Sequence, residues 1–169
     1  YSKDEPQLDV DTKDFLVALE QAFYFSTIIT YAQGMHLLAN ASAEYKYDLK
    51  LDEIAKIWRG GCIIRSLFLN DIYSAYQNNP KLAHLLLDKN VEQGVSESVK
   101  GARTGLSASI SAGIAAPAFA ALLSYGDNFR NKRMPSNLTQ AQRDYFGAHT
   151  YELIGKEGVF HTQWTKKND

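Results

Sequence analysis

Two side chains that favour anions, Arg143 and His149, lie six residues apart near the C-terminal end of the chain. A guanidinium presents a planar fork of hydrogen-bond donors, and an imidazole donates a hydrogen bond and gains positive charge beside an anion. In an unbroken helix the two side chains would point in different directions. Gly147 lies between them and can adopt the left-handed conformation that ends a helix. The spacing therefore indicates a pair that binds a phosphate group across a chain reversal.

The residues around this pair predict a short helix from about Leu138 to Phe146. Asn137 is a good N-cap, because its side-chain oxygen can accept a hydrogen bond from an N–H group of the first turn. Gly147 is expected to end the helix in the left-handed conformation.

Each candidate also has an interpretation without function. Arg143 would then pair with Asp144 or another surface carboxylate, and His149 would be an ordinary polar residue of an ordered tail. The other histidines and two further arginines carry no comparable pattern, and we expect them to be structural: His36, His84, His161, Arg59 and Arg65.

Three stretches of the chain resemble decarboxylating 6-phosphogluconate dehydrogenases. The C-terminal stretch is QRDYFGAHTYE at 142–152, followed by KEG at 156–158 and FHTQW at 160–164. The other two are IWRGGCIIRS at 57–66 and YAQG at 31–34. The resemblance runs in a consistent order from about residue 10 to residue 164, which makes it highly specific.

The resemblance implies oxidation of 6-phosphogluconate by NADP and decarboxylation to ribulose 5-phosphate, a step of the pentose phosphate pathway. It implies a homodimer in which the tail, residues 150–169, packs on the partner subunit. Arg143 and His149 would then bind the phosphate of 6-phosphogluconate in that partner's pocket. The resemblance assigns no catalytic, cofactor-binding or metal-binding residue to this chain.

The sequence lacks two parts that this reaction needs. One is a nucleotide-binding domain with its glycine-rich loop, and the other is the family's lysine and glutamate pair for acid–base steps. We therefore expect the chain to carry dimer surface and half of a phosphate site, with no turnover on its own and NADP bound only by the intact enzyme. The alternative is a non-catalytic helical dimerisation or interaction module derived from the same fold.

Composition limits the partners and the compartment. With 18 basic and 19 acidic residues the net charge is −1, which gives no field to attract nucleic acid or an anionic membrane. The single cysteine, Cys62, suits a reducing compartment, and we expect a cytoplasmic protein. Residues 1–6 have no apolar run, so we expect no signal peptide there. Thr104 to Gly126 is uncharged and long enough for a membrane, but its Ala, Gly and Ser content favours a buried helix.

Apolar periodicity predicts an all-α fold, one helical domain over residues 1–169 with a long central helix and an extended C-terminal tail. Asp11 caps the long helix, which runs to about Ala43 or Glu44. Gly34, inside it, is expected where another helix crosses closely. Further helices are predicted from the Asp52 cap to Trp58, over 63–76, over 81–87, over about 91–114 and from Pro117 to near Arg130. The apolar tail is expected to be buried in a groove of this subunit or another.

Overall fold

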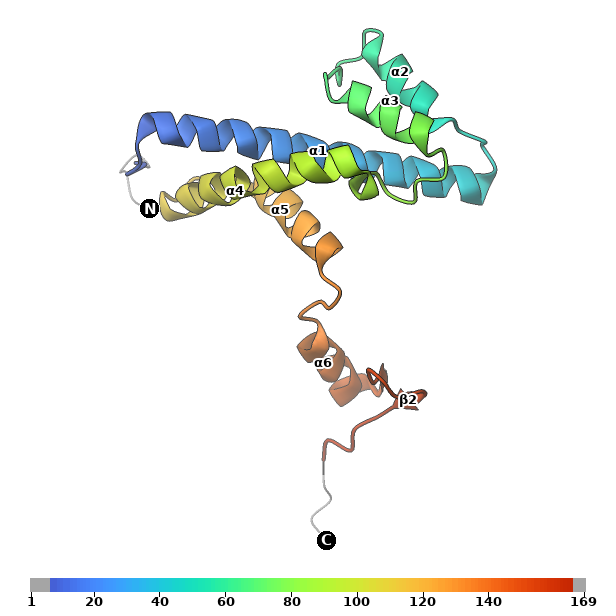
Figure 1. The fold of residues 1–169 in the computed structure, drawn as a ribbon. Coiled ribbons are helices and arrows are strands. Elements are labelled where there is room, and N and C mark those ends of the chain that lie inside the picture. The colour runs from blue at the N-terminus through green and yellow to red at the C-terminus, as the bar shows by residue number, and fades with distance from the viewer. Residues whose placement is uncertain (1–6, 166–169) are drawn as a thin grey trace. The chain divides into compact units, whose positions relative to one another are not determined.

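The computed structural model describes residues 7–165, which form two compact units that meet in the sequence at Asp127 and Asn128. Residues 1–6, where we expected no signal peptide, and the last four residues of the tail lie outside the described part. The first unit contains α1 (Thr12–Tyr45), α2 (Leu51–Arg59), α3 (Leu69–Asn78), the 3-10 turn η1 (Leu85–Leu87), α4 (Lys89–Ser111) and most of α5 (Pro117–Arg130) (Figure 1). The second contains α6 (Asn137–Gly147) and two short antiparallel strands, β1 (Tyr151–Glu152) and β2 (Val159–Phe160). The predicted all-α class is confirmed, although sequence reasoning missed this small hairpin.

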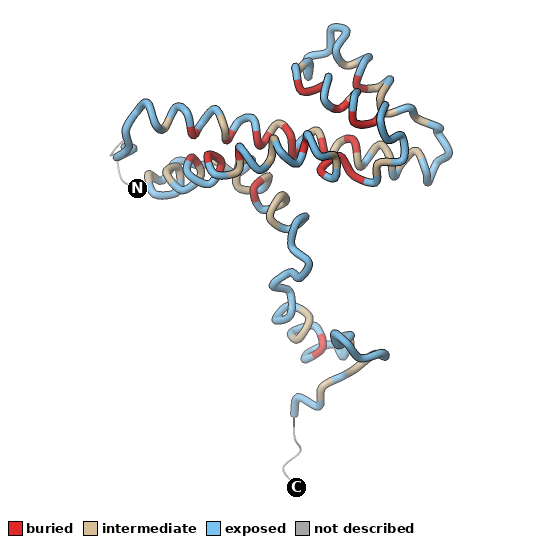
Figure 2. Tube along the Cα trace, viewed as in Figure 1, coloured by how far each residue is buried: buried red, intermediate tan, exposed pale blue. Residues whose placement is uncertain are grey.

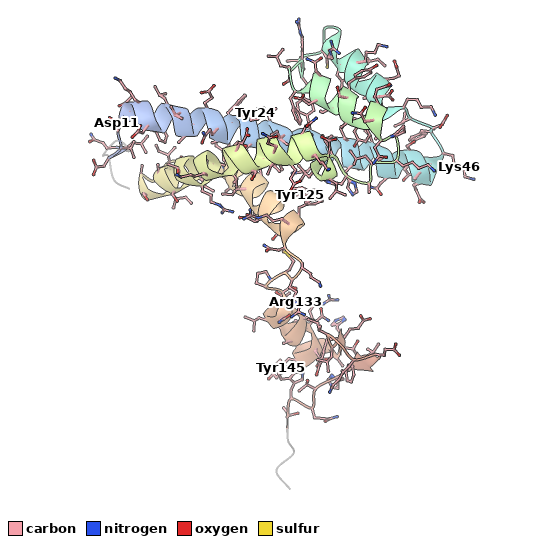
Figure 3. The ribbon with its side chains drawn as sticks, in the orientation of Figure 1. Asp11, Tyr24, Lys46, Tyr125, Arg133 and Tyr145 are labelled. Atoms are coloured by element: carbon pink, nitrogen blue, oxygen red, sulfur yellow. The ribbon has the colours of Figure 1, made fainter. Side chains whose placement is uncertain are left out.

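Helix α1 is the scaffold of the first unit. The side chain of Asp11 accepts hydrogen bonds from the backbone N–H groups of Lys13 and Asp14, so the predicted cap is confirmed. Lys46 ends the helix in the left-handed conformation, at the opposite end from Asp11 (Figure 3). At 1.5 Å a residue, a helix of 34 residues is about 50 Å long.

Among residues 7–165, α1 alone has the length and apolar composition to cross a membrane, a property that it shares with core helices of soluble proteins. The segment that raised this question in the sequence, residues 104–126, is divided in the structure between the end of α4 and the start of α5. Buried side chains of α1 belong to the core of the first unit, which favours the core interpretation for α1 as well.

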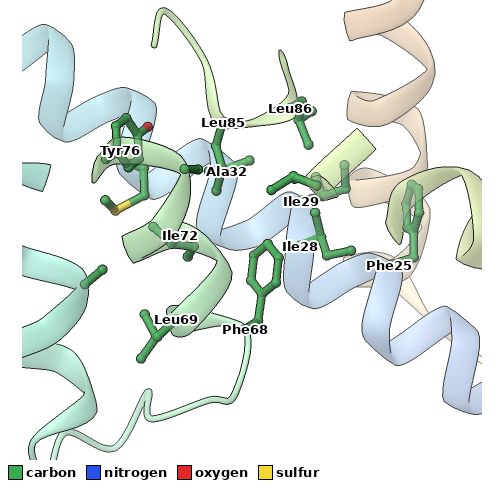
Figure 4. Packing of buried hydrophobic residues seen from close by; sticks show 14 of the residues in the cluster. Phe25, Ile28, Ile29, Ala32, Phe68, Leu69, Ile72, Tyr76, Leu85 and Leu86 are labelled. Atoms are coloured by element: carbon green, nitrogen blue, oxygen red, sulfur yellow. The ribbon is translucent and has the colours of Figure 1, made fainter. Parts of the chain in front are cut away.

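The core lies where one face of α1 meets α3, η1 and α4. Figure 4 shows Phe25, Ile28 and Ile29 of α1 beside Phe68, which precedes α3, and Leu86 of η1. Buried residues concentrate along these elements in Figure 2. Helices α1 and α4 run side by side, while α2 packs mainly on α3. The first unit is therefore built from neighbours of one long helix.

Close approach of α4 to α1 depends on Gly101. A Cβ atom at this position would lie 2.4 Å from Cβ of Gln21 and 2.9 Å from the carbonyl oxygen of Ala18. At Gly34, by contrast, an added Cβ would meet nothing within 4 Å. The prediction of a close crossing at Gly34 is therefore wrong within residues 7–165, and the glycine that permits the approach of α4 to α1 is Gly101.

Residues 60–68 form a loop, where the sequence predicted that the helix resumes at once. Gly60 ends α2, and Gly61 has φ +115°, a conformation that a residue with a side chain rarely adopts. Ile63 is fully exposed and Leu67 is 87% exposed, so their helical spacing does not reflect a buried helix face.

Two smaller predictions also fail. The stretch over 81–87 is helical only in the short turn η1. Asp52 does not cap α2, because the cap position is Lys50, without a side-chain hydrogen bond, and the Asp52 carboxylate instead accepts from Gln77 of α3.

A buried histidine joins three elements of the first unit. His84 Nδ1 accepts a hydrogen bond of 3.2 Å from the N–H of Leu86, and its Nε2 lies 3.0 Å from the hydroxyl oxygen of Tyr125. The His36 ring lies 4.8 Å away, centroid to centroid. Burial, and then the charge of His36, lowers the pKa of His84. These contacts agree with the structural role expected for His84.

We predict opposite effects for two glycine-to-alanine substitutions in the first unit. Gly101→Ala should destabilise it by about 1–3 kcal/mol, because the new methyl group overlaps Gln21 and the backbone of Ala18. Gly34→Ala, the matched control, should stabilise α1 by about 1 kcal/mol, because alanine favours a helix and nothing obstructs it. Urea unfolding followed by circular dichroism measures both. Equal effects of the two substitutions would contradict the close crossing.

Candidate functional site

A single carboxylate, that of Asp144, holds the second unit together. Its side chain is 0% exposed, and its two oxygens accept four hydrogen bonds from residues that follow α6. Oδ1 accepts from the N–H of Thr150 at 3.0 Å and from His161 Nδ1 at 2.8 Å. Oδ2 accepts from the N–H of Thr162 at 3.0 Å and from Trp164 Nε1 at 2.8 Å. These bonds fasten the tail to the helix.

The charge of Asp144 is favoured by these donors. Burial alone would raise the pKa of Asp144. The hydrogen bonds from His161, Thr162 and Trp164, together with the charge of His161, outweigh burial and lower the pKa to about 2. Asp144 is therefore ionised at neutral pH, in the form that can accept all four bonds.

A tight turn carries the chain from α6 into the tail. Ala148 and Thr150 have φ values of 47° and 63°, and the N–H of Ala148 bonds to the carbonyl oxygen of Asp144 at 3.0 Å. The Gln140 side chain donates a hydrogen bond of 2.5 Å to the carbonyl oxygen of Thr150. His149 therefore stands between two residues whose backbones are anchored to α6.

The predicted start and the predicted end of this helix are each wrong by one residue. The left-handed residue is Ala148 rather than Gly147, which remains inside α6. Asn137 is the first helical residue rather than the cap, and the cap position, Ser136, makes no side-chain hydrogen bond. Residues 137–139 of this first turn are exposed, so water can satisfy their N–H groups and the helix can begin without a side-chain cap.

Arg143 and His149, the predicted phosphate pair, are both exposed. The alternative pairing of Arg143 with Asp144 is not found, because the tail occupies the carboxylate. The side chain of Arg143 makes no hydrogen bond or ion pair with any other residue of the described range 7–165.

Gly147 shows how the imidazole of His149 lies on α6. A Cβ atom at Gly147 would be 2.6 Å from Cδ2 and 2.8 Å from Nε2 of His149, so the ring covers the Gly147 position. Arg143 and Gly147 are four residues apart in α6, and positions with that spacing share one helix face. The His149 ring thus lies on the face from which Arg143 projects, about one turn away. Binding of a phosphate by the two side chains stays a prediction.

The apolar tail is only partly buried within the second unit. The indole of Trp164 packs edge-on against Tyr145 of α6, which is labelled in Figure 3. The rings of Tyr151 and Phe160 stack across the hairpin. Ile154 is 72% exposed and Val159 is 68% exposed. Side chains of this kind leave apolar surface available for another protein surface.

The first unit carries an apolar groove of about 700 Å³ between α1, the 60–68 loop and the start of α5. Its lining includes Phe23, Tyr31, Trp58, Ile64 and Phe119, and the hydroxyl group of Tyr31 donates to the carbonyl oxygen of Ile64. One cationic residue, Arg65, also lines it.

Neither of the two arginines near this groove has the role expected from the sequence. Arg59 and Arg65 are exposed, and neither side chain bonds a carboxylate or a helix-end carbonyl within residues 7–165. The expectation that they satisfy such groups inside the fold is therefore wrong for the described part of the chain.

The described residues contain no group of three His, Cys, Asp or Glu side chains that could hold a metal ion.

Comparisons with known proteins match nearly the whole chain. The family model described as "6-phosphogluconate dehydrogenase, C-terminal domain" matches residues 1–164. A decarboxylating 6-phosphogluconate dehydrogenase of Spinacia oleracea is 48% identical over 93% of this chain and 32% of its own length. A relative of the same name from Synechococcus elongatus is 50% identical over 91% of this chain and 33% of its own length. The chain thus spans about a third of the length of these curated relatives.

A solved structure agrees with the fold. The 6-phosphogluconate dehydrogenase of Plasmodium falciparum, described as apo and in complex with NADP+ and with 6-phosphogluconate, aligns with a TM-score of 0.90 at 42% identity. The alignment covers 96% of this chain and 35% of that chain.

We predict that the contacts of the tail with α6 survive mild acid and are lost between about pH 4 and pH 2. The pKa of Asp144 is lowered from 3.8 to about 2 on folding, so its contribution to stability is present above the unfolded pKa and disappears as the pH falls through the folded one. The NMR signal of the Trp164 indole N–H reports the contact, and Trp58 in the first unit serves as the control. Loss of the Trp164 signal already near neutral pH would contradict the assignment.

Proposed function

Because the chain belongs to the 6-phosphogluconate dehydrogenase family and matches its C-terminal domain, we propose that it is the dimerisation and substrate-binding part of an NADP-dependent, decarboxylating enzyme. The reaction would convert 6-phosphogluconate to ribulose 5-phosphate in the cytoplasm. The relatives that carry this activity in their names are about three times as long as this chain. We therefore assign the activity to the intact enzyme and expect no turnover from these 169 residues alone.

The placement of His149 over the Arg143 face of α6 is the observation that supports a role in binding phosphate. Arg143 is exposed and unpaired within residues 7–165, so its guanidinium is available to an external anion. His149 is exposed on the same face and can add a second donor to a phosphate oxygen. A guanidinium with a neighbouring imidazole suits a dianion better than it suits an uncharged sugar hydroxyl.

The chemical steps belong to other parts of the enzyme. Arginine is too weak an acid to exchange protons near neutral pH, so Arg143 would bind and orient the sugar phosphate without transferring a proton. In the intact enzyme, NADP bound by the nucleotide-binding domain would be the hydride acceptor. Residues of this chain would fix one end of the substrate so that its other end meets these groups.

Exposed apolar surface supports a homodimer in which the tail packs on the partner subunit. The tail presents Ile154 and Val159, and the first unit presents the apolar groove and the exposed side chains of Phe23, Ile63 and Leu67. Surface of this kind is costly to leave in water and is typical of interfaces between subunits. In such a dimer Arg143 and His149 would complete the pocket of the partner.

In the intact enzyme we predict that Arg143→Ala raises the KM for 6-phosphogluconate about tenfold to a hundredfold, because one charge-assisted contact worth about 1.5–3 kcal/mol is lost. The KM for NADP should remain nearly unchanged. Arg133→Ala, which removes an exposed arginine of the same unit, is the matched control and should alter neither constant. Steady-state kinetics with each substrate varied measures both. An effect of Arg143→Ala on the NADP constant alone would refute the phosphate role and leave Arg143 with a structural one.

We predict that the chain sediments as a dimer at tens of micromolar and that Ile154→Asp shifts it towards monomer, since a buried charge at an interface is costly. Lys156→Asp introduces the same side chain two residues away, at an exposed position, and should leave the dimer intact. Analytical ultracentrifugation distinguishes the species. A monomer with a tail that proteases cleave readily would contradict the proposed exchange of tails.

A further inference from the structure

We propose that Asp144 is a positioning residue of the phosphate site: its buried carboxylate fixes His149 beside Arg143 and keeps Arg143 free for the substrate. The inference rests on the proposed function, because it concerns the same site. The Asp144 side chain has no exposed surface, so it acts through Arg143 and His149 and does not touch the substrate.

The first step of the argument is the turn that carries His149. The backbone of Asp144 accepts the N–H of Ala148 at 3.0 Å, and its side chain accepts the N–H of Thr150 at 3.0 Å. One residue therefore anchors the chain on both sides of His149. Arg143 is the neighbour of Asp144 in α6, so the same residue fixes the position of the imidazole relative to the guanidinium.

The second step concerns charge. If the Asp144 carboxylate were exposed beside Arg143, it would offset part of the guanidinium charge, and Arg143 would be a poorer anion site. Here the carboxylate turns inward and four donors occupy its oxygens. The tail thus takes up the negative charge of Asp144, and the positive charge of Arg143 remains available.

The third step explains why the residue must be a carboxylate. Two of its partners are backbone N–H groups, and a third, Trp164 Nε1, is a donor only. An asparagine would present its own NH₂ group to at least one of these donors, and that contact would be repulsive. Asp144→Asn therefore keeps the shape of the side chain but breaks part of the network.

The fourth step connects the site with the tail. His161, Thr162 and Trp164 reach Asp144 from beyond the hairpin, so the end of the tail also holds the turn in place. Trp164→Phe removes one donor and keeps an aromatic ring against Tyr145. This milder change should loosen the turn without removing the carboxylate.

The test uses the intact enzyme and compares Asp144→Asn, Trp164→Phe, Arg143→Ala and the double variant Arg143→Ala with Asp144→Asn. We expect Asp144→Asn to raise the KM for 6-phosphogluconate about tenfold, and Trp164→Phe to raise it by a smaller factor, with the KM for NADP unchanged in both. Because Asp144 acts through the pair, the double variant should raise the KM by less than the product of the two single effects. Glu157→Gln neutralises an exposed carboxylate of the hairpin and is the matched control.

The outcomes separate this inference from the function on which it rests. A lower melting temperature for both Asp144→Asn and Trp164→Phe, with an unchanged KM for 6-phosphogluconate, would overturn the positioning role, provided that Arg143→Ala still raises that KM. Full multiplication of the two effects in the double variant would overturn it as well. An Arg143→Ala variant with an unchanged KM would instead refute the proposed phosphate site itself. If Asp144→Asn does not fold, Trp164→Phe alone tests the positioning role: a raised KM for 6-phosphogluconate supports it, and an unchanged KM with a lower melting temperature overturns it.

Discussion

Removing a carboxylate from water is costly unless donors replace the lost hydration, and Asp144 meets this requirement with groups taken from the far end of the second unit. The unit is too small to enclose a large apolar core: it contains the end of α5, the short helix α6 and a hairpin whose two strands have two residues each. Four hydrogen bonds to one charge give it the specificity that packing alone would not provide. The turn, the hairpin and the tail all take their positions from that charge.

The first unit depends on packing instead. Helix α1 is longer than the elements that cover it, so it forms a common wall for α4, α3 and η1 while other parts of its surface stay exposed. The close approach at Gly101 joins α4 to α1, and the buried His84 joins η1 to α5. Aromatic and aliphatic side chains remain exposed around the apolar groove, which is typical of surface that packs against further protein.

Both units therefore make sense as parts of a larger protein. The relatives are about three times as long, and the chain corresponds to the C-terminal domain of their family. Arg143 of α6 and His149 of the anchored turn are exposed, so the site proposed for them would need further protein surface to be complete. The proposed enzyme supplies what is missing from its other domain and its other subunit.

The sequence by itself determined the family, the all-α class and the elements whose signals are local. The Asp11 cap and the start at Pro117 follow from neighbouring residues, and the structure confirms both of them. Arg143 and His149 were also recognisable as an anion-seeking pair, because their side-chain chemistry and the family string are visible without coordinates.

Only the tertiary structure decided which residues hold these elements in place. Asp144 looked like a surface partner for Arg143, yet its partners lie 6 to 20 residues away, a distance over which no helical or strand period carries information. Gly34 and Gly101 look equivalent within their helices, and only the approach of α4 to α1 distinguishes them. In the loop at 60–68 the apolar residues are spaced as in a helix, but the structure exposes Ile63 and Leu67 and forms no helix there. In each case the deciding contact is formed between segments distant in sequence, so its partner cannot be read from local residue type.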